Sequence, residues 1–352
     1  MRSSSLPLIA FSLFSVSSYA VENGAPVDWS QQDNTVRFDS RQTGRQGLCT
    51  GTLVAGRYVL TAAHCLVESE LDSFTTASGS NYSSSHFVNH DNFVEDDGFS
   101  GEDFGIITAD EQIDYHHIQF LNINDHAENE AINISGFGGT IDTLNKADFT
   151  FSHYNWGLPF ILYADVVNDS HTVPGDSGAT WINPNDEIIA IHKGSDTTIN
   201  WDENGNEIHT RETYGTDIQA VKDFITDNID AWHYPTLADT DENGKATITI
   251  QSLHRNEVVD MAWGDNVTIT GGTCLDGLPI TPFDKCTYDI ESDGTQGELY
   301  LTDNEVIHIN KPIETTGGGD GGNNNTDNDD NGGSMGFWSL LLLGVATLRR
   351  KR

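Results

Sequence analysis

Residues 61–65 read Thr-Ala-Ala-His-Cys, and residues 175–178 read Gly-Asp-Ser-Gly. The first stretch offers a histidine base among small residues. The second offers a serine in a glycine-flanked turn, where backbone N–H groups can point at a developing oxyanion. A serine hydroxyl is a poor nucleophile until a base takes its proton and an oxyanion hole holds the charge. The two stretches therefore predict nucleophilic catalysis by Ser177 with His64 as the base.

Together, and in the order histidine then serine, these stretches resemble the trypsin-like (chymotrypsin-fold) serine proteases. The resemblance implies an all-β, two-barrel domain that ends on a helix and acts on protein or peptide substrates. It implies no metal or organic cofactor. It also implies an oxyanion hole made by the backbone N–H groups of Gly175 and Ser177. Family members usually have a second glycine after Gly178, where this chain has Ala179.

The third catalytic residue is expected to be an acid that lies between the other two in the sequence. Asp103 leads directly into the apolar run 104–107, which is typical of a buried strand. Asp91, Asp96 and Asp97 lie in a polar, glycine-flanked stretch that reads as a loop. We therefore predict that Asp103 orients the imidazole of the catalytic histidine and stabilises its charged form.

The amino-terminal segment 1–20 has the layout of a signal peptide, with Arg2, an apolar-rich middle and a Ser-Tyr-Ala end. Cleavage after Ala20 by signal peptidase would expose Val21. The protease resemblance implies that this new amino terminus forms an ion pair with Asp176, the aspartate before the nucleophile. The sequence thus predicts a secreted enzyme that signal peptidase itself matures.

The chain has four cysteines, an even number that suits an oxidising compartment. The resemblance implies a disulfide between Cys49 and Cys65, beside the predicted catalytic histidine. Cys274 and Cys286 are predicted to form a second, local bridge. Neither pair has close metal-ligand spacing, so a zinc site is not predicted.

Substrate preference is indicated by the residues around the nucleophile. His171 stands where trypsin-type enzymes place an aspartate, which disfavours cleavage after Lys or Arg. The segment 172–194 resembles the bacterial glutamyl endopeptidases, which read an acidic side chain with a threonine and a histidine at the offsets of Thr172 and His192. A hydroxyl and an imidazole can both donate to a carboxylate, and a protonated imidazole adds charge.

An aromatic or small apolar preference stays open beside the acidic one, for two reasons. Some glutamyl enzymes use the amino-terminal amine at the pocket, whereas Asp176 would engage it elsewhere. A shift of one residue would also turn His192 to the other face of its strand.

The formal net charge of −37 disfavours nucleic acid or an anionic membrane as a partner.

Short β-type segments such as 187–191, separated by Gly/Asn/Asp-rich turns, run from 21 to 234 and predict the protease domain. The helix is expected at 217–229, where apolar residues form one stripe. A catalytically silent, protease-fold binding protein is the alternative function, and the complete set of three catalytic residue types argues against it.

After residue 235 the pattern of polar and apolar residues changes. Residues 236–312 alternate polar and apolar side chains, which predicts a small β-sandwich, with targeting to a surface as a hypothesis for its role. Residues 313–333 are rich in Gly, Asn and Asp and predict a disordered linker. The segment 334–352 is an apolar stretch followed by Arg-Arg-Lys-Arg.

Together with the preceding Gly-Gly, this tail resembles the GlyGly-CTERM sorting signals of Gram-negative bacteria. The resemblance implies cleavage by a rhomboid-type protease during type II export, only transient membrane contact, and a cell-surface or released enzyme. An ordinary tail anchor is the alternative.

Overall fold

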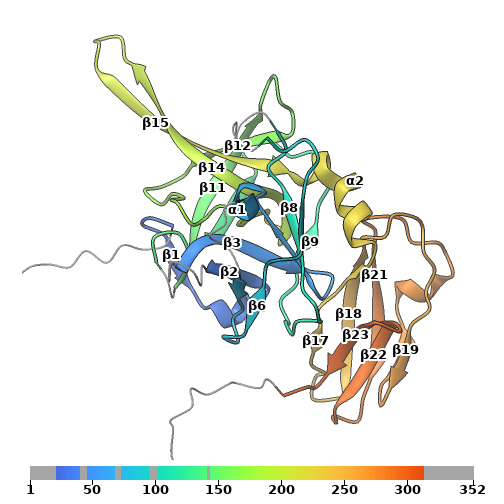
Figure 1. The fold of residues 1–352 in the computed structure, drawn as a ribbon. Helices are drawn as coiled ribbons and strands as arrows, with labels where there is room; N and C mark the ends of the chain where they lie inside the picture. Colours follow the sequence, from blue (N-terminus) through green and yellow to red (C-terminus); the bar gives the residue numbers. More distant parts are fainter. Residues whose placement is uncertain (1–20, 40–45, 68–72, 95–100, 141–142, 313–352) are drawn as a thin grey trace, which may run out of the picture. The chain divides into compact units, whose positions relative to one another are not determined.

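The computed structural model describes residues 21–39, 46–67, 73–94, 101–140 and 143–312, whose course is drawn in Figure 1. The predicted signal segment 1–20, the predicted linker 313–333 and the predicted sorting tail 334–352 lie outside the described residues. So do two of the alternative acids, Asp96 and Asp97. No helix within the described ranges is long and apolar enough to cross a membrane.

The first sheet is a seven-stranded antiparallel half-barrel from the N-terminal third of the chain. In sheet order its strands are β6 (Asn81–Ser83), β5 (Ser73–Thr75), β2 (Thr35–Asp39), β3 (Gln46–Val54), β4 (Tyr58–Thr61), β8 (Gly105–Thr108) and β7 (Phe87–Asn89). The apolar side chains of β4 and β8 are buried, as the apolar runs in their sequences predict. A four-residue helix, α1 (His64–Val67), follows β4.

The second sheet closes on itself, because β11 pairs with both β10 and β12. Around the barrel run β11 (Leu144–Tyr154), β10 (Ala131–Gly136), β13 (Thr180–Ile182), β14 (Glu187–Trp201), β15 (Glu207–Asp217) and β12 (Ile161–Val166). β1 (Ala25–Val27) adds to β11, and β9 (Phe120–Leu121) pairs with β14. The closed barrel and the half-barrel confirm the predicted all-β, two-barrel fold class.

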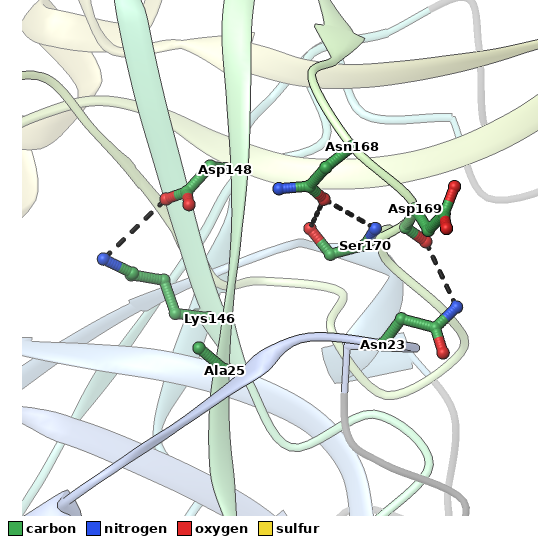
Figure 2. A pocket seen from close by; sticks show the side chains of 7 residues that line it. All are labelled: Asn23, Ala25, Lys146, Asp148, Asn168, Asp169 and Ser170. Atoms are coloured by element: carbon green, nitrogen blue, oxygen red, sulfur yellow. Dashed lines mark hydrogen bonds and ion pairs between the residues drawn. The ribbon is translucent and has the colours of Figure 1, made fainter.

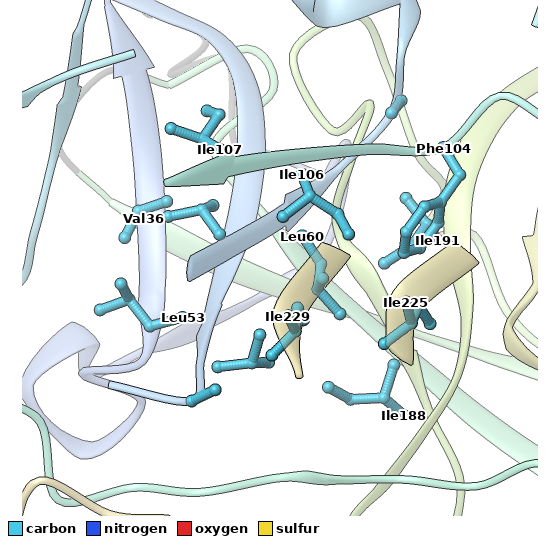
Figure 3. Close-up of a cluster of buried hydrophobic side chains, with 14 of the residues drawn as sticks. Val36, Leu53, Leu60, Phe104, Ile106, Ile107, Ile188, Ile191, Ile225 and Ile229 are labelled. Carbon is cyan, nitrogen blue, oxygen red and sulfur yellow. The ribbon is translucent and has the colours of Figure 1, made fainter. Parts of the chain in front are cut away.

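The predicted helix is α2 (Ile218–Ile229). It begins where the Asp217 carboxylate accepts a hydrogen bond from Gln219 N, and it ends at Asp230, whose backbone is left-handed. Its apolar stripe is buried, and Figure 3 shows Ile225 and Ile229 packed among side chains of both sheets. The same core cluster includes Val36, Leu53, Leu60, Ile106 and Ile107 of the first sheet and Ile188 and Ile191 of β14. The helix therefore fastens the half-barrel to the closed barrel.

Two four-stranded sheets follow the helix. One contains β16 (Trp232–His233), β18 (Lys245–Ser252), β21 (Lys285–Glu291) and β20 (Thr268–Gly271). The other contains β17 (Leu237–Ala238), β23 (Glu305–Ile309), β22 (Gly297–Thr302) and β19 (Trp263–Asp265). Their inward apolar residues form a core of their own, as the alternating sequence predicts. A disulfide joins Cys274, in the short 3-10 helix η2 (Thr273–Asp276), to Cys286 in β21 and confirms the second predicted bridge.

Buried hydrogen bonds join these two sheets to Ala55 after β3 and to the segment of β9. The His233 ring accepts from Ala55 N at 3.1 Å and donates to Gln119 O at 3.0 Å. The Gln251 amide bonds both the N–H and the carbonyl of Leu121. All described residues belong to one compact unit. The division into separate domains at 234–236 stays a prediction.

Candidate active site

The fold brings His64 and Asp103 together at one edge of the half-barrel. His64 follows the end of β4, Asp103 precedes the start of β8, and these antiparallel strands pair Thr61 with Gly105. Asp103 Oδ2 lies 2.6 Å from His64 Nδ1, and Asp103 Oδ1 accepts from His64 N at 2.9 Å. The carboxylate is buried, whereas the imidazole is about one-third exposed. The acid thus fixes the ring and leaves its Nε2 as the free nitrogen.

The backbone of Asp103 is held from the other barrel. Thr216, a buried residue of β15, donates from Oγ1 to Asp103 O at 3.2 Å. Sequence reasoning missed this residue, because a lone threonine in a strand carries no motif. The contact ties the predicted orienting acid to the strand that leads into helix α2.

The Ser177 turn is held by Thr50, a buried residue of β3. Thr50 N donates to Ser177 O at 2.8 Å, and Thr50 Oγ1 donates to Gly175 O at 3.0 Å. A disulfide joins the neighbouring Cys49 to Cys65, as predicted. Cys65 directly follows His64, so the serine turn of the closed barrel lies beside the histidine of the half-barrel. Sequence reasoning also missed Thr50, whose one signal is its place next to the first cysteine.

Glycine is required at position 178 because the serine turn lies very close to Thr50 in β3 and Thr61 in β4. Its φ is +84°, and a Cβ there would lie 2.2 Å from Thr50 O and 2.1 Å from Thr61 Oγ1. No other residue type fits without moving the backbone. Both Ser177 and His64 are described residues, and the Ser177 hydroxyl forms no hydrogen bond with the ring; the bond to Asp103 uses Nδ1 and leaves Nε2 open toward the serine. Such contacts are commonly longer before substrate binds.

The two N–H groups predicted for the oxyanion hole are free. Around the turn, Asp176 N donates to Val173 O and Gly178 N donates to His192 O. Within the described part of the chain, the N–H groups of Gly175 and Ser177 have no acceptor. Gly175 adopts a φ of +109°, which glycine tolerates. The turn therefore leaves unpaired the pair of donors that an oxyanion needs.

Asp176 is fully buried, and no described side chain gives it a cationic partner. Its carboxylate accepts from Gly138 N and Val173 N, each at 2.8 Å. Burial raises the pKa of Asp176 to about 7, although both hydrogen bonds oppose the rise. Val21 is also fully buried and packs in the core of the closed barrel. The predicted ion-pair partners are thus both interior, and the full-length chain has a peptide nitrogen at Val21 rather than an amine.

The segment after Val21 docks on the loop that precedes Thr172. His171 N donates to Glu22 O at 3.0 Å, and the His171 ring lies 3.1 Å from the Glu22 carboxylate. Figure 2 shows Asn23 reaching Asp169 at one side of a hollow of about 650 Å³. The hollow is lined by Asn23, Ala25, Lys146, Asp148, Asn168, Asp169 and Ser170 and contains none of the predicted catalytic residues. His171 therefore contacts the N-terminal segment.

Thr172 and His192 are both buried close to the serine turn. Thr172 Oγ1 has no hydrogen-bond partner among the residues that the structure describes. His192 N donates to Ala179 O at 2.7 Å, and its Nδ1 accepts from the Trp181 indole at 3.4 Å. Burial, and then the charge of His64, lower the pKa of His192 to about 3, against an opposing effect of Asp103. The imidazole is therefore neutral near pH 7, and the extra charge expected of a protonated His192 is not available.

Among the described residues, one group of side chains comes close enough to share a metal ion: Cys49, His64 and Cys65. Both sulfurs belong to the disulfide, so neither offers the thiolate that binds zinc.

Two solved structures are similar to this chain. The Vibrio cholerae VesB protease is similar at a TM-score of 0.45 and 15% identity, over 81% of this chain and 98% of that one. The secreted serine protease VesC from Vibrio cholerae is similar at a TM-score of 0.46 and 11% identity, over 81% of this chain and 70% of that one. No curated protein sequence matches. Residues 23–225, more than half of the 352-residue chain, match the family model described as Trypsin. The chain therefore belongs to the trypsin family of serine proteases.

Proposed function

We propose that this protein is a secreted serine endopeptidase in which His64, Asp103 and Ser177 form the catalytic triad. The observation that carries the proposal is the double contact of Asp103 with His64 beside a serine turn whose flanking N–H groups are unpaired. A buried aspartate that fixes the histidine tautomer, together with preorganised N–H donors, supplies what acyl transfer from a peptide requires.

In the proposed reaction, Ser177 Oγ attacks the peptide carbonyl carbon as His64 Nε2 takes its proton. The N–H groups of Gly175 and Ser177 bind the negative oxygen of the tetrahedral intermediate. The C–N bond then breaks, His64 returns the proton to the leaving amine, and an acyl-enzyme remains. Water then attacks the acyl-enzyme carbonyl as His64 takes its proton, the bond to Ser177 Oγ breaks, and the carboxylic acid product is released. Asp103 stabilises the imidazolium of His64 during both acylation and deacylation.

Maturation is proposed to occur at Val21. A new ammonium group at this buried residue would give Asp176 the cationic partner that it lacks in the full-length chain. Pairing would also join the N-terminal segment to the serine turn. Glu22 and Asn23, which bond the loop of residues 169–171, are in position to transmit the change.

A preference for acidic residues on the acyl side of the cleaved bond is the proposed specificity, with aromatic or small apolar residues as the alternative. The unpaired hydroxyl of Thr172 supports the acidic choice, because it is a buried donor without a partner among the described residues.

We further propose export by the signal segment, a cell-surface or released location in a Gram-negative bacterium, and sorting by the GlyGly-CTERM-type tail. Signal peptidase and a rhomboid-type protease are the proposed processing partners.

Profiling of a peptide library with the mature enzyme and with Ser177→Ala tests the function. We expect cleavage and fluorophosphonate labelling by the first protein and neither by the second. Correct maturation at Val21 without cleavage or labelling would instead indicate a silent, protease-fold binding protein.

A further inference from the structure

The wall of β14 and β15 beside the serine turn presents one continuous face of polar side chains. The two strands extend as a long hairpin in Figure 1. Its register pairs His192 with Gly215 and Ser195 with Thr213, with a bulge between them. Directly paired residues of antiparallel strands share a face, and so do alternate residues of one strand. The bulge therefore keeps His192 and Ser195 on the same side, although three positions separate them.

The same rule adds Arg211 to this face, because it pairs with Thr197 and lies two residues before Thr213. The acidic neighbours Asp196 and Glu212 pair with each other on the opposite face. The side of the hairpin that continues from His192 thus carries a cation and hydroxyl groups, without those two carboxylates.

Thr172 packs directly against this polar face. Its carbonyl oxygen accepts from Ser195 Oγ and from Arg211 Nη1, each at 3.4 Å. The side-chain hydroxyls of Thr172 and Thr213 are both in fully buried residues, and neither has a hydrogen-bond partner in the described ranges. An unpaired buried hydroxyl costs about 1–3 kcal/mol. The Arg211 guanidinium contacts the Thr172 backbone, and Thr213 lies two residues away on the same face, so the two unpaired hydroxyls indicate a site that a ligand completes.

The charge on Arg211 is available for such a ligand. The chain has 54 acidic and 17 basic side chains, yet Arg211 has no carboxylate partner among the described residues. Its one hydrogen bond in the described part goes to the Thr172 carbonyl, which leaves most of its five N–H donors free. Of His192, Ser195, Thr213 and Arg211, only Arg211 is positively charged near pH 7, because His192 is neutral.

We propose that Arg211, with the hydroxyls of Thr172 and Thr213, binds the side-chain carboxylate of the substrate residue on the acyl side of the cleaved bond. This rests on the proposed function and names the residues that recognise an acidic substrate. The guanidinium supplies charge and a planar pair of donors, and the hydroxyls donate to the remaining lone pairs. His192 then serves as a neutral hydrogen-bonding partner.

The test compares matched peptides that differ only in Glu or Gln on the acyl side of the bond. For the enzyme that begins at Val21, we expect kcat/KM to be higher for the Glu peptide. Arg211→Gln should lower the Glu/Gln ratio by about tenfold to hundredfold, the range of a charge-assisted hydrogen bond. Thr213→Val, of similar shape, should lower the ratio by a smaller factor. Lys245→Gln removes one exposed positive charge elsewhere and should leave the ratio unchanged.

Arg211→Glu provides a second measurement, with an expected shift of preference from Glu toward Lys peptides. Equal loss on both peptides in Arg211→Gln would assign Arg211 a structural role and overturn the proposal. Fluorophosphonate labelling of the same preparations tests the serine protease function separately from the role of Arg211 in substrate preference. An enzyme that labels at Ser177 but does not prefer Glu overturns this proposal alone, whereas one that neither labels nor cleaves overturns the proposed function as well.

Discussion

The imidazole of His233 accepts a hydrogen bond from the backbone N–H of Ala55, 3.1 Å away, and donates through its other nitrogen to Gln119. The ring is fully buried, and the bond accepted from Ala55 requires the neutral form, whereas the bond donated to Gln119 does not. A protonated ring could not accept from Ala55. This one side chain therefore makes the junction between the half-barrel and the C-terminal sheets sensitive to acid.

We expect stability to fall as the pH drops from about 6.5 to about 4. Burial lowers the pKa of His233 from 6.5 to about 4 in the folded chain. In that window the unfolded chain binds a proton that the folded chain does not, so acid favours unfolding. The loss from this group is on the order of 3 kcal/mol. Urea unfolding across the range measures it.

His192 has a lowered pKa as well, so the matched variant isolates His233. His233→Asn keeps an acceptor but does not titrate. It should be less stable at pH 8 and should show a shallower loss below pH 6.5. An equal pH slope in both proteins would contradict the assignment to His233.

Asp103→Asn should lower kcat by about 10⁴-fold, because an amide at this position favours the wrong histidine tautomer. Asp91→Asn is the matched control, since Asp91 is an exposed acid from the polar stretch that offered the alternatives. It should retain full activity in the same peptide assay. Loss of activity in the control and not in Asp103→Asn would reverse the proposed assignment of the acid.

Gly178→Ala should destabilise the protein by about 3 kcal/mol or more, from a left-handed backbone and from overlap with Thr50 and Thr61. Gly205→Ala shares the positive φ, but nothing lies within 4 Å of its Cβ position. That control should cost only about 1–2 kcal/mol. Thermal unfolding of the two variants separates the overlap from the backbone strain, and equal losses would contradict the close approach.

Forms that begin at Val21 and at Ala20 should differ in activity and in their response to pH. In the longer form the pKa of Asp176 stays near 7 against 3.8 when unfolded. As the pH rises, the Asp176 carboxyl therefore loses its proton at a lower pH in the unfolded chain than in the folded chain. The free energy of unfolding falls between about pH 4 and pH 7, by on the order of 4 kcal/mol. An amine at Val21 should remove this loss and raise kcat/KM at least a hundredfold. Similar curves for both forms would argue against the ion pair.

The sequence was sufficient to predict the elements whose chemistry is local. The helix α2 was predicted from an apolar stripe at helical spacing, and the structure adds Asp217 as its cap. Both disulfides followed from the cysteines and the family resemblance. The residues around the serine turn were predictable because glycine, serine and aspartate there form one short motif.

Contacts between distant strands could not be predicted in this way. Thr50 and Thr216 hold the site through single hydrogen bonds across the two barrels. The face shared by His192 and Arg211 depends on a one-residue bulge, which reverses the alternation of every residue beyond it. The neutrality of His192 depends on burial, which composition does not report.

The bonds between Gln251 and Leu121 join positions 130 residues apart in the sequence. A ribosome completes the triad residues well before it reaches Gln251, so Leu121 in β9 and Ala55 after β3 lack their last hydrogen-bonding partners until late in synthesis. A chain interrupted after Ser177 would contain every catalytic residue and still lack the surface against which Leu121 and Ala55 pack. The protease fold thus obtains its last packing surface only when the C-terminal sheets have been synthesised.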